Sequence, residues 1–258
     1  MNKLVVLIKF NRNDIHRQPD NGQRFNRTLG KKEWWDNRCK ILQDIVLPSL
    51  KRQTFQDFDV LAPFTTDIKT EYAQETMNAL HAFGALVFWD DRKIKDFVEP
   101  DSFIRKRYSQ YDNVILLNLD SDDIYHPKAF EVLMKAPVLA GQVCIFRDGY
   151  VYDMITGRCG VYRGNVVPPP FFAFTFTKES MKSEKHWNDY RDAYNLWIEH
   201  PTLMKSKVHR DMPVGLFCQI FHGYNVTSNW ELFKKKISRE LFLEERDRVI
   251  GEFGFKEL

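Results

Sequence analysis

The chain has 258 residues, of which 43% are hydrophobic and 28% charged, and its formal net charge at pH 7 is +3. This length gives room for one large α/β domain, with or without a small appendage, and the composition is that of a globular protein. The net charge is too small to indicate a nucleic-acid-binding protein.

The cysteines and the apolar segments bear on the compartment of the protein. The four cysteines are far apart in the sequence and include no C-x-x-C pair, which indicates reduced core thiols rather than a disulfide or zinc framework. The longest apolar run near the N-terminus is Leu4 to Ile8, too short for a signal peptide or a membrane span. We therefore expect a cytoplasmic protein.

Strands and helices are predicted to alternate through the first half of the chain. Apolar runs and helical spacing predict strands over 4–8, 59–63, 85–89 and 114–119, and helices over 34–50, 71–83 and 103–111. Residues 13–30 are polar and predict a long loop. The alternation predicts a mostly parallel sheet that is covered by helices.

The pattern changes after residue 140. Strands are predicted over 143–151, 160–166, 171–177 and 213–221, with a hairpin turn at Thr156-Gly157. Helices are predicted in the second half of 178–200 and, as one amphipathic helix, over 229–253. The chain is thus divided into residues 1–136, 137–228 and 229–258 within a single domain.

An acidic cluster follows the most apolar strand, which leads from Val114 directly into Asp120-Ser121-Asp122-Asp123. Open α/β sheets place their ligands at the carboxyl ends of strands. Crowded carboxylates raise one another's pKa unless a cation neutralises them, and hard oxygen ligands suit Mg²⁺ or Mn²⁺. The alternative is that Asp122 and Asp123 cap the helix that follows. A cap needs only one such residue, so the metal site is the preferred interpretation.

Four segments carry a resemblance to a known family. They are VVLIKFN, PSLKRQTFQDFDVL, LDSDDIYHP and MPVGLFCQIFHGYN, and their order and spacing extend over residues 3–229. With these segments the chain resembles GT-A glycosyltransferases and, more closely, the bacterial family of putative rhamnosyltransferases. The resemblance implies a GT-A-like α/β fold: a mostly parallel central sheet flanked by helices, an antiparallel acceptor-side extension and a C-terminal helix. Residues 1–136 would then be the half that binds the nucleotide sugar, and residues 137–228 the acceptor-side half.

The resemblance also implies an activity, which is transfer of a sugar such as rhamnose from a nucleoside-diphosphate sugar to a glycan or lipid-linked acceptor. Mn²⁺ or Mg²⁺ would stabilise the charge that develops on the diphosphate. Asp122 is the first choice for the metal ligand, Asp120 would bind the metal or the ribose, and Asp123 is expected to cap the next helix. His222, in a Gly-Tyr-Asn turn, would be a metal ligand or a structural histidine.

Further residues are candidates for donor binding. Asn11, at the end of the first strand, and Asp67, at the tip of the second, would bind the nucleotide sugar, although Asp67 could equally cap its loop. Arg105 and Arg107 precede the central strand and would pair with phosphates, unless they only cover an exposed helix face.

The catalytic base is not identified by the resemblance. Members of the family carry a glutamate after the Pro-Phe strand, where this chain reads PPPFFAFTF. An inverting transfer needs a carboxylate in reach of the acceptor hydroxyl, and Asp148, Asp153 and Asp189 are the candidates. Lys234 to Lys236 could contact an anionic membrane surface, although a solvated helix face is the simpler interpretation.

Two other functions compete with glycosyl transfer. A non-catalytic GT-A-like scaffold would bind a nucleotide sugar or glycan without turning it over, and its expected sign is a broken Asp-x-Asp, which is intact here. A phosphohydrolase with an Asp-x-Asp nucleophile places that motif after the first strand, whereas here at least three strands precede it.

Overall fold

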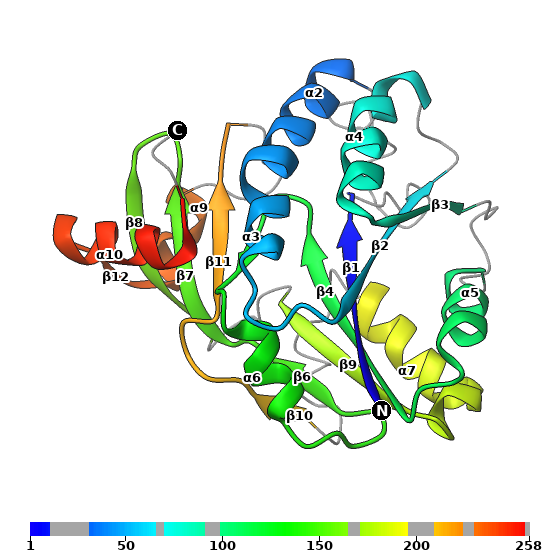
Figure 1. Ribbon diagram of the computed structural model, residues 1–258. Helices are drawn as coiled ribbons and strands as arrows, with labels where there is room; N and C mark the ends of the chain where they lie inside the picture. Colours follow the sequence, from blue (N-terminus) through cyan, green and yellow to red (C-terminus); the bar gives the residue numbers. More distant parts are fainter. Residues whose placement is uncertain are drawn as a thin grey trace.

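The computed structural model of the chain describes residues 1–10, 31–65, 70–90, 99–164, 171–195, 209–223 and 230–255. Within these residues strands and helices alternate through the first half, as predicted, and two sheets share the second half (Figure 1). No helix in these ranges is long and apolar enough to cross a membrane.

Seven strands of the described residues form the central sheet, in the order β10-β6-β9-β4-β1-β2-β3. These strands are β1 (Asn2–Lys9), β2 (Phe58–Thr65), β3 (Leu86–Asp90), β4 (Asn113–Asp120), β6 (Val143–Ile145), β9 (Phe172–Thr177) and β10 (His209–Asp211). Four of the six neighbouring pairs are parallel, and β9 runs antiparallel to both of its neighbours. The prediction of a mostly parallel central sheet with an antiparallel extension is confirmed.

Helices cover both faces of this sheet (Figure 1). The helices on one face are α2 (Lys32–Ile41), the π-helical turn η1 (Leu42–Val46), α3 (Leu47–Lys51) and α4 (Thr70–Phe83). Those on the other face are α5 (Glu99–Tyr108) and α7 (Glu184–Asn195), the second preceded by the 3-10 turn η2 (Ser180–Lys182). Strand β4 is buried from residue 114 to 119 because Leu117 packs toward the first set and Leu116 toward the second. Its near-continuous apolar run follows from burial on both faces.

The helix that was predicted over 34–50 extends from residue 32 to 51, with the π-helical turn η1 in its middle. Pro48 lies in the first turn of α3, immediately after this π-helical turn. Proline has no N–H to donate to the carbonyl four residues earlier, so the helical hydrogen-bond ladder is interrupted there. A one-turn π segment accommodates such an interruption without ending the helix.

The second sheet packs against the first and has five strands within the described residues, in the order β12-β8-β7-β11-β5. These strands are β5 (Ile124–Tyr125), β7 (Asp148–Asp153), β8 (Arg158–Arg163), β11 (Phe217–Phe221) and β12 (Ile237–Glu240). The predicted hairpin is β7–β8, which turns at Gly157, whose φ is +68°. The strand that was predicted over 143–151 is two strands, because β6 pairs with β9 and β10 whereas β7 pairs with β8 and β11.

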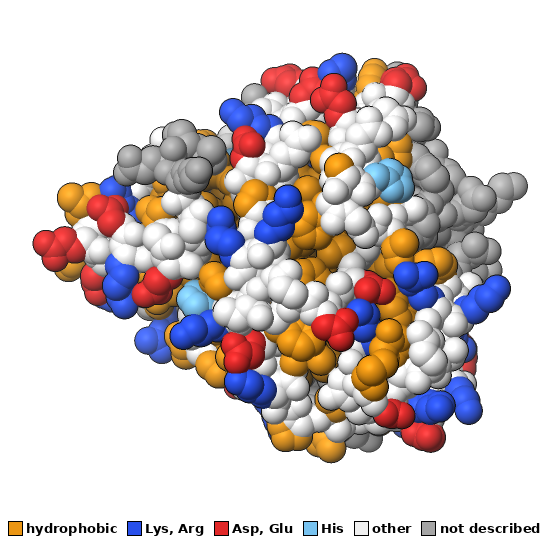
Figure 2. All heavy atoms as spheres, viewed as in Figure 1, with side chains coloured by type: hydrophobic (Ala, Val, Ile, Leu, Met, Phe, Trp, Pro, Cys, Tyr) orange, Lys and Arg blue, Asp and Glu red, His pale blue; other side chains and the backbone are white. Residues whose placement is uncertain are grey.

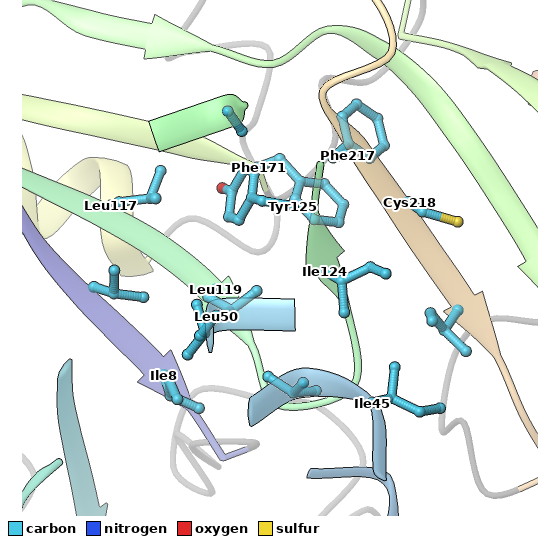
Figure 3. Close-up of a cluster of buried hydrophobic side chains, with 14 of the residues drawn as sticks. Ile8, Ile45, Leu50, Leu117, Leu119, Ile124, Tyr125, Phe171, Phe217 and Cys218 are labelled. Carbon is cyan, nitrogen blue, oxygen red and sulfur yellow. The ribbon is translucent and has the colours of Figure 1, made fainter. Parts of the chain in front are cut away.

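One hydrophobic core joins the two sheets. Figure 3 shows Leu117 and Leu119 of β4, Tyr125 of β5 and Phe217 of β11 in the same buried cluster. The Tyr125 hydroxyl donates a 2.7 Å hydrogen bond to the carbonyl of Asn118, so its polar end is satisfied inside this core. The short strand β5, which follows the acidic turn directly, therefore fixes β4 to the second sheet.

The prediction of one helix over 229–253 is wrong. The segment contains α9 (Trp230–Phe233), the 3-10 turn η3 (Lys234–Lys236), strand β12 and then α10 (Leu243–Phe253). Strand β12 pairs antiparallel with β8, a partner that lies far away in the sequence. The helical spacing of apolar residues carried no information about that partner, and sheet pairing prevailed over local periodicity. The predicted strand 213–221 is also shorter, because a turn with Gly215 at φ +83° precedes β11.

Candidate functional site

The acidic turn lies at the carboxyl end of β4, next to the end of β1. Asp120 is the last residue of β4, where it stands opposite Lys9 of β1. The amide of Asp123 donates to the carbonyl of Asp120 at 3.2 Å and closes the turn. Ligands of open α/β sheets bind at such carboxyl ends, so this edge is the candidate site.

The structure brings His222 to Asp122 across a hundred residues of sequence. Strand β11 pairs antiparallel with β5, with Cys218 opposite Ile124, so the end of β11 lies over the acidic turn. His222 follows that end directly, and its Nε2 lies 3.0 Å from Oδ2 of Asp122. The two side chains are nearly buried, with 7% and 14% of their surfaces exposed. Their juxtaposition is a structural fact, and their role as metal ligands stays a prediction.

The sequence analysis missed Arg38, which belongs to the same cluster. Its Nη1 lies 2.6 Å from Oδ2 of Asp122, and only 3% of the side chain is exposed. The guanidinium stacks on the indole of Trp34, one helical turn earlier, with 4.8 Å from Cζ to the ring centroid. A usable signal existed, since Arg38 falls on the helical stripe of Trp34, Trp35 and Ile41 that α2 buries. A cation on a buried stripe requires an anionic partner.

The environments of the two adjacent aspartates shift their pKa values in opposite directions. Burial alone would raise the pKa of Asp122, but the charge of Arg38 and the hydrogen bond with His222 outweigh it and lower that pKa to about 2. Burial raises the pKa of Asp123 well above its usual range, and the negative charges of Asp122 and Asp120 add to this effect. Asp122 is therefore a carboxylate at neutral pH, while its neighbour holds a proton far more strongly than an ordinary aspartate.

Asp123 does not cap the following helix, contrary to the prediction. Helix α6 (Ala129–Lys135) begins six residues later, and its N-cap position is Lys128, whose side chain makes no capping hydrogen bond. Oδ1 of Asp123 instead accepts a 2.8 Å hydrogen bond from the amide of Ile220 in β11. The buried Asp123 thus holds the end of β11, and with it His222, against the acidic turn.

The arrangement around Asp122 does not fit a divalent cation. Carboxylate oxygen and imidazole nitrogen are suitable donors for Mn²⁺. However, Oδ2 of Asp122 already faces both the guanidinium of Arg38 and the imidazole of His222. No three His, Cys, Asp or Glu side chains among the described residues are placed to hold a metal ion together. The cationic position beside Asp122 is taken by a side chain of the protein itself.

The three candidate bases lie in different parts of the molecule. Asp153 ends β7 beside Phe221, but its carboxylate accepts hydrogen bonds from the amides of Ile155 and Thr156 and from the Thr156 hydroxyl. Asp148 begins β7 and lies about 16 Å from Asp153 along the strand. Its carboxylate accepts a 3.0 Å hydrogen bond from the amide of Gly164. Asp189 is exposed on α7.

Arg105 and Arg107 lie at the opposite edge of the central sheet from the acidic turn. Helix α5 leads into the amino end of β4, whereas Asp120 ends that strand. Arg105 pairs with Glu184 of α7 at 2.7 Å and stacks on Trp187. Arg107 lies 3.8 Å from Asp59, near the start of β2. The structure therefore does not bring these arginines to the carboxylates with which the sequence analysis grouped them.

Arg107 instead lines a separate hollow of about 330 Å³ at the amino ends of β2 and β3. Its walls combine aromatic and charged side chains, including Phe58, Phe83 and Lys51. Figure 2 shows hydrophobic side chains gathered in the middle of this face, over β2 and between α3 and α4. The remaining donor-binding candidates, Asn11 and Asp67, lie outside the residues that the structure describes.

All four cysteines (Cys39, Cys144, Cys159 and Cys218) are buried and unpaired, which agrees with the prediction of core thiols. Burial raises the pKa of Cys144 to about 11 and that of Cys159 to about 12. Such thiols are poor nucleophiles, so none of the cysteines contributes chemistry to the candidate site.

Comparisons with known structures give distant similarities. The glycosyltransferase GlyE of Streptococcus pneumoniae TIGR4 is 12% identical with a TM-score of 0.45, covering 99% of this chain, which spans only 61% of the GlyE chain. S. aureus TarS 1-349 is 12% identical with a TM-score of 0.38, covering 98% of this chain and 70% of its own. The inositol-1-phosphate CTP transferase of T. maritima is 10% identical with a TM-score of 0.39 and covers 96% of both chains.

No curated protein matches the chain. A protein-family model described as putative rhamnosyl transferase matches residues 12–128, somewhat less than half of the sequence. The matched segment includes Arg38, Asp120 and Asp122 but ends long before His222. Over residues 12–128 the chain is therefore similar to the putative rhamnosyl transferase family, which confirms the resemblance that its motifs indicate.

Proposed function

We propose that this protein is a glycosyltransferase that moves a sugar from a nucleoside-diphosphate sugar to an acceptor hydroxyl. One observation carries the proposal: the family match contains the whole of β4 and its acidic turn, and that turn lies at the ligand-binding edge of a mostly parallel sheet. Rhamnose as the transferred sugar is the finer part of the proposal, and it rests on the description of the family.

The proposed roles follow from the positions of the side chains. Asp120, partly exposed at the end of β4, would accept hydrogen bonds from donor hydroxyls such as those of the ribose. Asp122 is ionised and fixed by two neighbours, so it would hold His222 in one orientation. The imidazole and the surrounding positive charge would face the diphosphate as its negative charge grows.

The acceptor and its base are the least defined parts of the proposal. Asp153 is engaged in its own turn, while Asp148 and Asp189 lie away from the end of β11, so the base stays a prediction. A glycan or a lipid-linked sugar would be the acceptor. Lys234 and Lys235 are exposed and would be the residues through which the protein contacts an anionic membrane surface.

Two measurements test the proposed activity. The first is a thermal-shift screen against nucleoside-diphosphate sugars, including rhamnose carried on thymidine and uridine diphosphates, in the presence of either Mn²⁺ or EDTA. A ligand at 100 times its dissociation constant adds about 2.7 kcal/mol to the free energy of unfolding, which gives a clear shift. The second is release of nucleoside diphosphate from whichever donor stabilises the protein.

Asp120→Asn is expected to reduce donor binding or turnover, whereas Asp247→Asn, at an exposed position of α10, is the matched control and should leave both unchanged. Stabilisation by a donor without release of its diphosphate, even with acceptors present, would favour the non-catalytic binding protein instead. If no nucleotide sugar at millimolar concentration shifts the unfolding temperature, the proposal is wrong.

A further inference from the structure

The ion pair between Arg38 and Asp122 is a built feature of the fold. Arg38 is 3% exposed, and its Nη1 lies 2.6 Å from Oδ2 of Asp122. A guanidinium cannot lose its proton in a protein, so this cation is permanent. Trp34 fixes its position from the other side. A charge buried this deeply is tolerated only because its partner is present.

The geometry leaves little room for a second cation at the same oxygen. Arg38 and His222 both approach Oδ2 of Asp122, from α2 and from the end of β11. A divalent ion at this oxygen would lie within a few ångströms of the guanidinium and would be repelled by it at low local dielectric. The single negative charge of Asp122 is already balanced.

We infer that Arg38 occupies the position that a divalent metal ion would take at Asp122. The guanidinium neutralises the carboxylate, so Asp122 binds no metal ion. Arg38 is a positioning residue that holds Asp122, and through it His222, in a fixed orientation. The inference rests on the proposed function only for the identity of the ligand, because occupancy of Asp122 by a metal can be measured without a donor. It replaces the Mn²⁺ or Mg²⁺ requirement that the sequence predicts.

The test is the affinity of the full chain for Mn²⁺, measured from the electron paramagnetic resonance signal of the unbound ion and by titration calorimetry. The variants are Arg38→Met, Asp122→Asn and the double variant Arg38→Met/Asp122→Asn. Arg105→Met is the matched control, because Arg105 also stacks on an indole, at 4.9 Å, and pairs with a carboxylate at 2.7 Å, but at the opposite edge of the sheet. Each protein is measured alone and with UDP, GDP or dTDP, since a diphosphate could complete a metal site.

The Asp122→Asn variant should have the same affinity for Mn²⁺ as the wild type, with or without a diphosphate. The Arg38→Met variant should gain a Mn²⁺ site, because Asp122 then lacks its counter-charge. Its affinity for Mn²⁺ should exceed that of the wild type by about 10-fold or more. That gain should be absent from the double variant and from Arg105→Met. A gain that requires Asp122 cannot come from loosened packing alone.

A wild-type Mn²⁺ site that weakens about 10-fold or more in Asp122→Asn would overturn the inference. So would an Arg38→Met protein that folds but gains no site. If Arg38→Met does not fold, the comparison between the wild type and Asp122→Asn still decides the matter. Failure of every diphosphate and nucleotide sugar to bind would remove the proposed function but would leave the Mn²⁺ result intact, so the two failures are distinguishable.

Discussion

The buried ion pair between Arg38 and Asp122 makes a quantitative prediction about stability. Arg38→Met and Asp122→Asn each replace one charged residue by a neutral side chain of similar shape. The remaining charge is then buried without its partner, since the side chains of Arg38 and Asp122 are only 3% and 14% exposed. Breaking a buried pair in this way costs about 3–5 kcal/mol. Replacing both at once removes the uncompensated charge, so the double variant should be no less stable than either single variant.

The lowered pKa of Asp122, to which Arg38 and His222 both contribute, adds a pH dependence. Lowering that pKa from 3.8 to about 2 corresponds to a stabilisation on the order of 2 kcal/mol. Because the folded-state pKa lies below the unfolded one, this contribution is fully present above pH 3.8 and is lost as the pH falls through about 2. Asp122→Asn should therefore be markedly less stable than the wild type at pH 6, and most of that difference should be gone by pH 2.

The assay is urea unfolding of all four proteins at pH 6 and at about pH 2.5, followed by circular dichroism. The double-mutant cycle at pH 6 should give a coupling energy of about 3–5 kcal/mol between Arg38 and Asp122, because the double variant loses no more stability than a single variant does. A solvent-exposed pair gives below about 1 kcal/mol. A coupling of that smaller size, or single losses that simply add in the double variant, would refute the placement of Arg38 inside the cluster.

Other predictions follow from packing and burial. Gly149→Ala should cost about 2 kcal/mol in thermal or urea unfolding, because a Cβ there would lie 2.7 Å from the ring and the carbonyl oxygen of Phe217. Its control, Gly251→Ala in α10, meets nothing within 4 Å and should instead gain about 0.5–1 kcal/mol. In the folded protein at pH 8 the four buried thiols should resist Ellman's reagent, and all four should react once it is denatured; rapid reaction of the native protein would contradict their burial. Arg105→Ala should leave the affinity for any stabilising nucleotide sugar unchanged, because Arg105 joins α5 to α7 rather than reaching the acidic turn.

The sequence predicted what depends on local patterns. The apolar run before Asp120 is buried on both faces and is a central strand, and the acidic turn follows it as expected. The alternation of strands and helices up to that point was also correct. These features are visible in sequence because side-chain burial repeats with the period of the element itself.

The errors arose where the partner of a segment lies far away in the chain. Residues 237–240 have a helical apolar pattern in their context but pair with β8 as strand β12. Arg105 and Arg107 were grouped with Asp120 because they precede it closely, yet a strand separates its two ends by its full length, about 23 Å for eight residues. Residues that immediately precede a strand lie at its beginning, and they are therefore far from a site at its end.

Arg38 shows why the charges of this site were the hardest part to predict. Two aspartates in a row suggest excess negative charge, and a metal ion is the ordinary remedy for it. Here the excess is removed in two other ways: Arg38 neutralises Asp122, and the raised pKa of Asp123 favours its neutral form. Both depend on tertiary structure, one on the approach of α2 and one on the burial of Asp123, which raises its pKa even though the hydrogen bond from the Ile220 amide lowers it. That hydrogen bond holds the end of β11 beside the turn, so the burial of one aspartate sets its protonation, while its contact with β11 sets the position of His222 against the other.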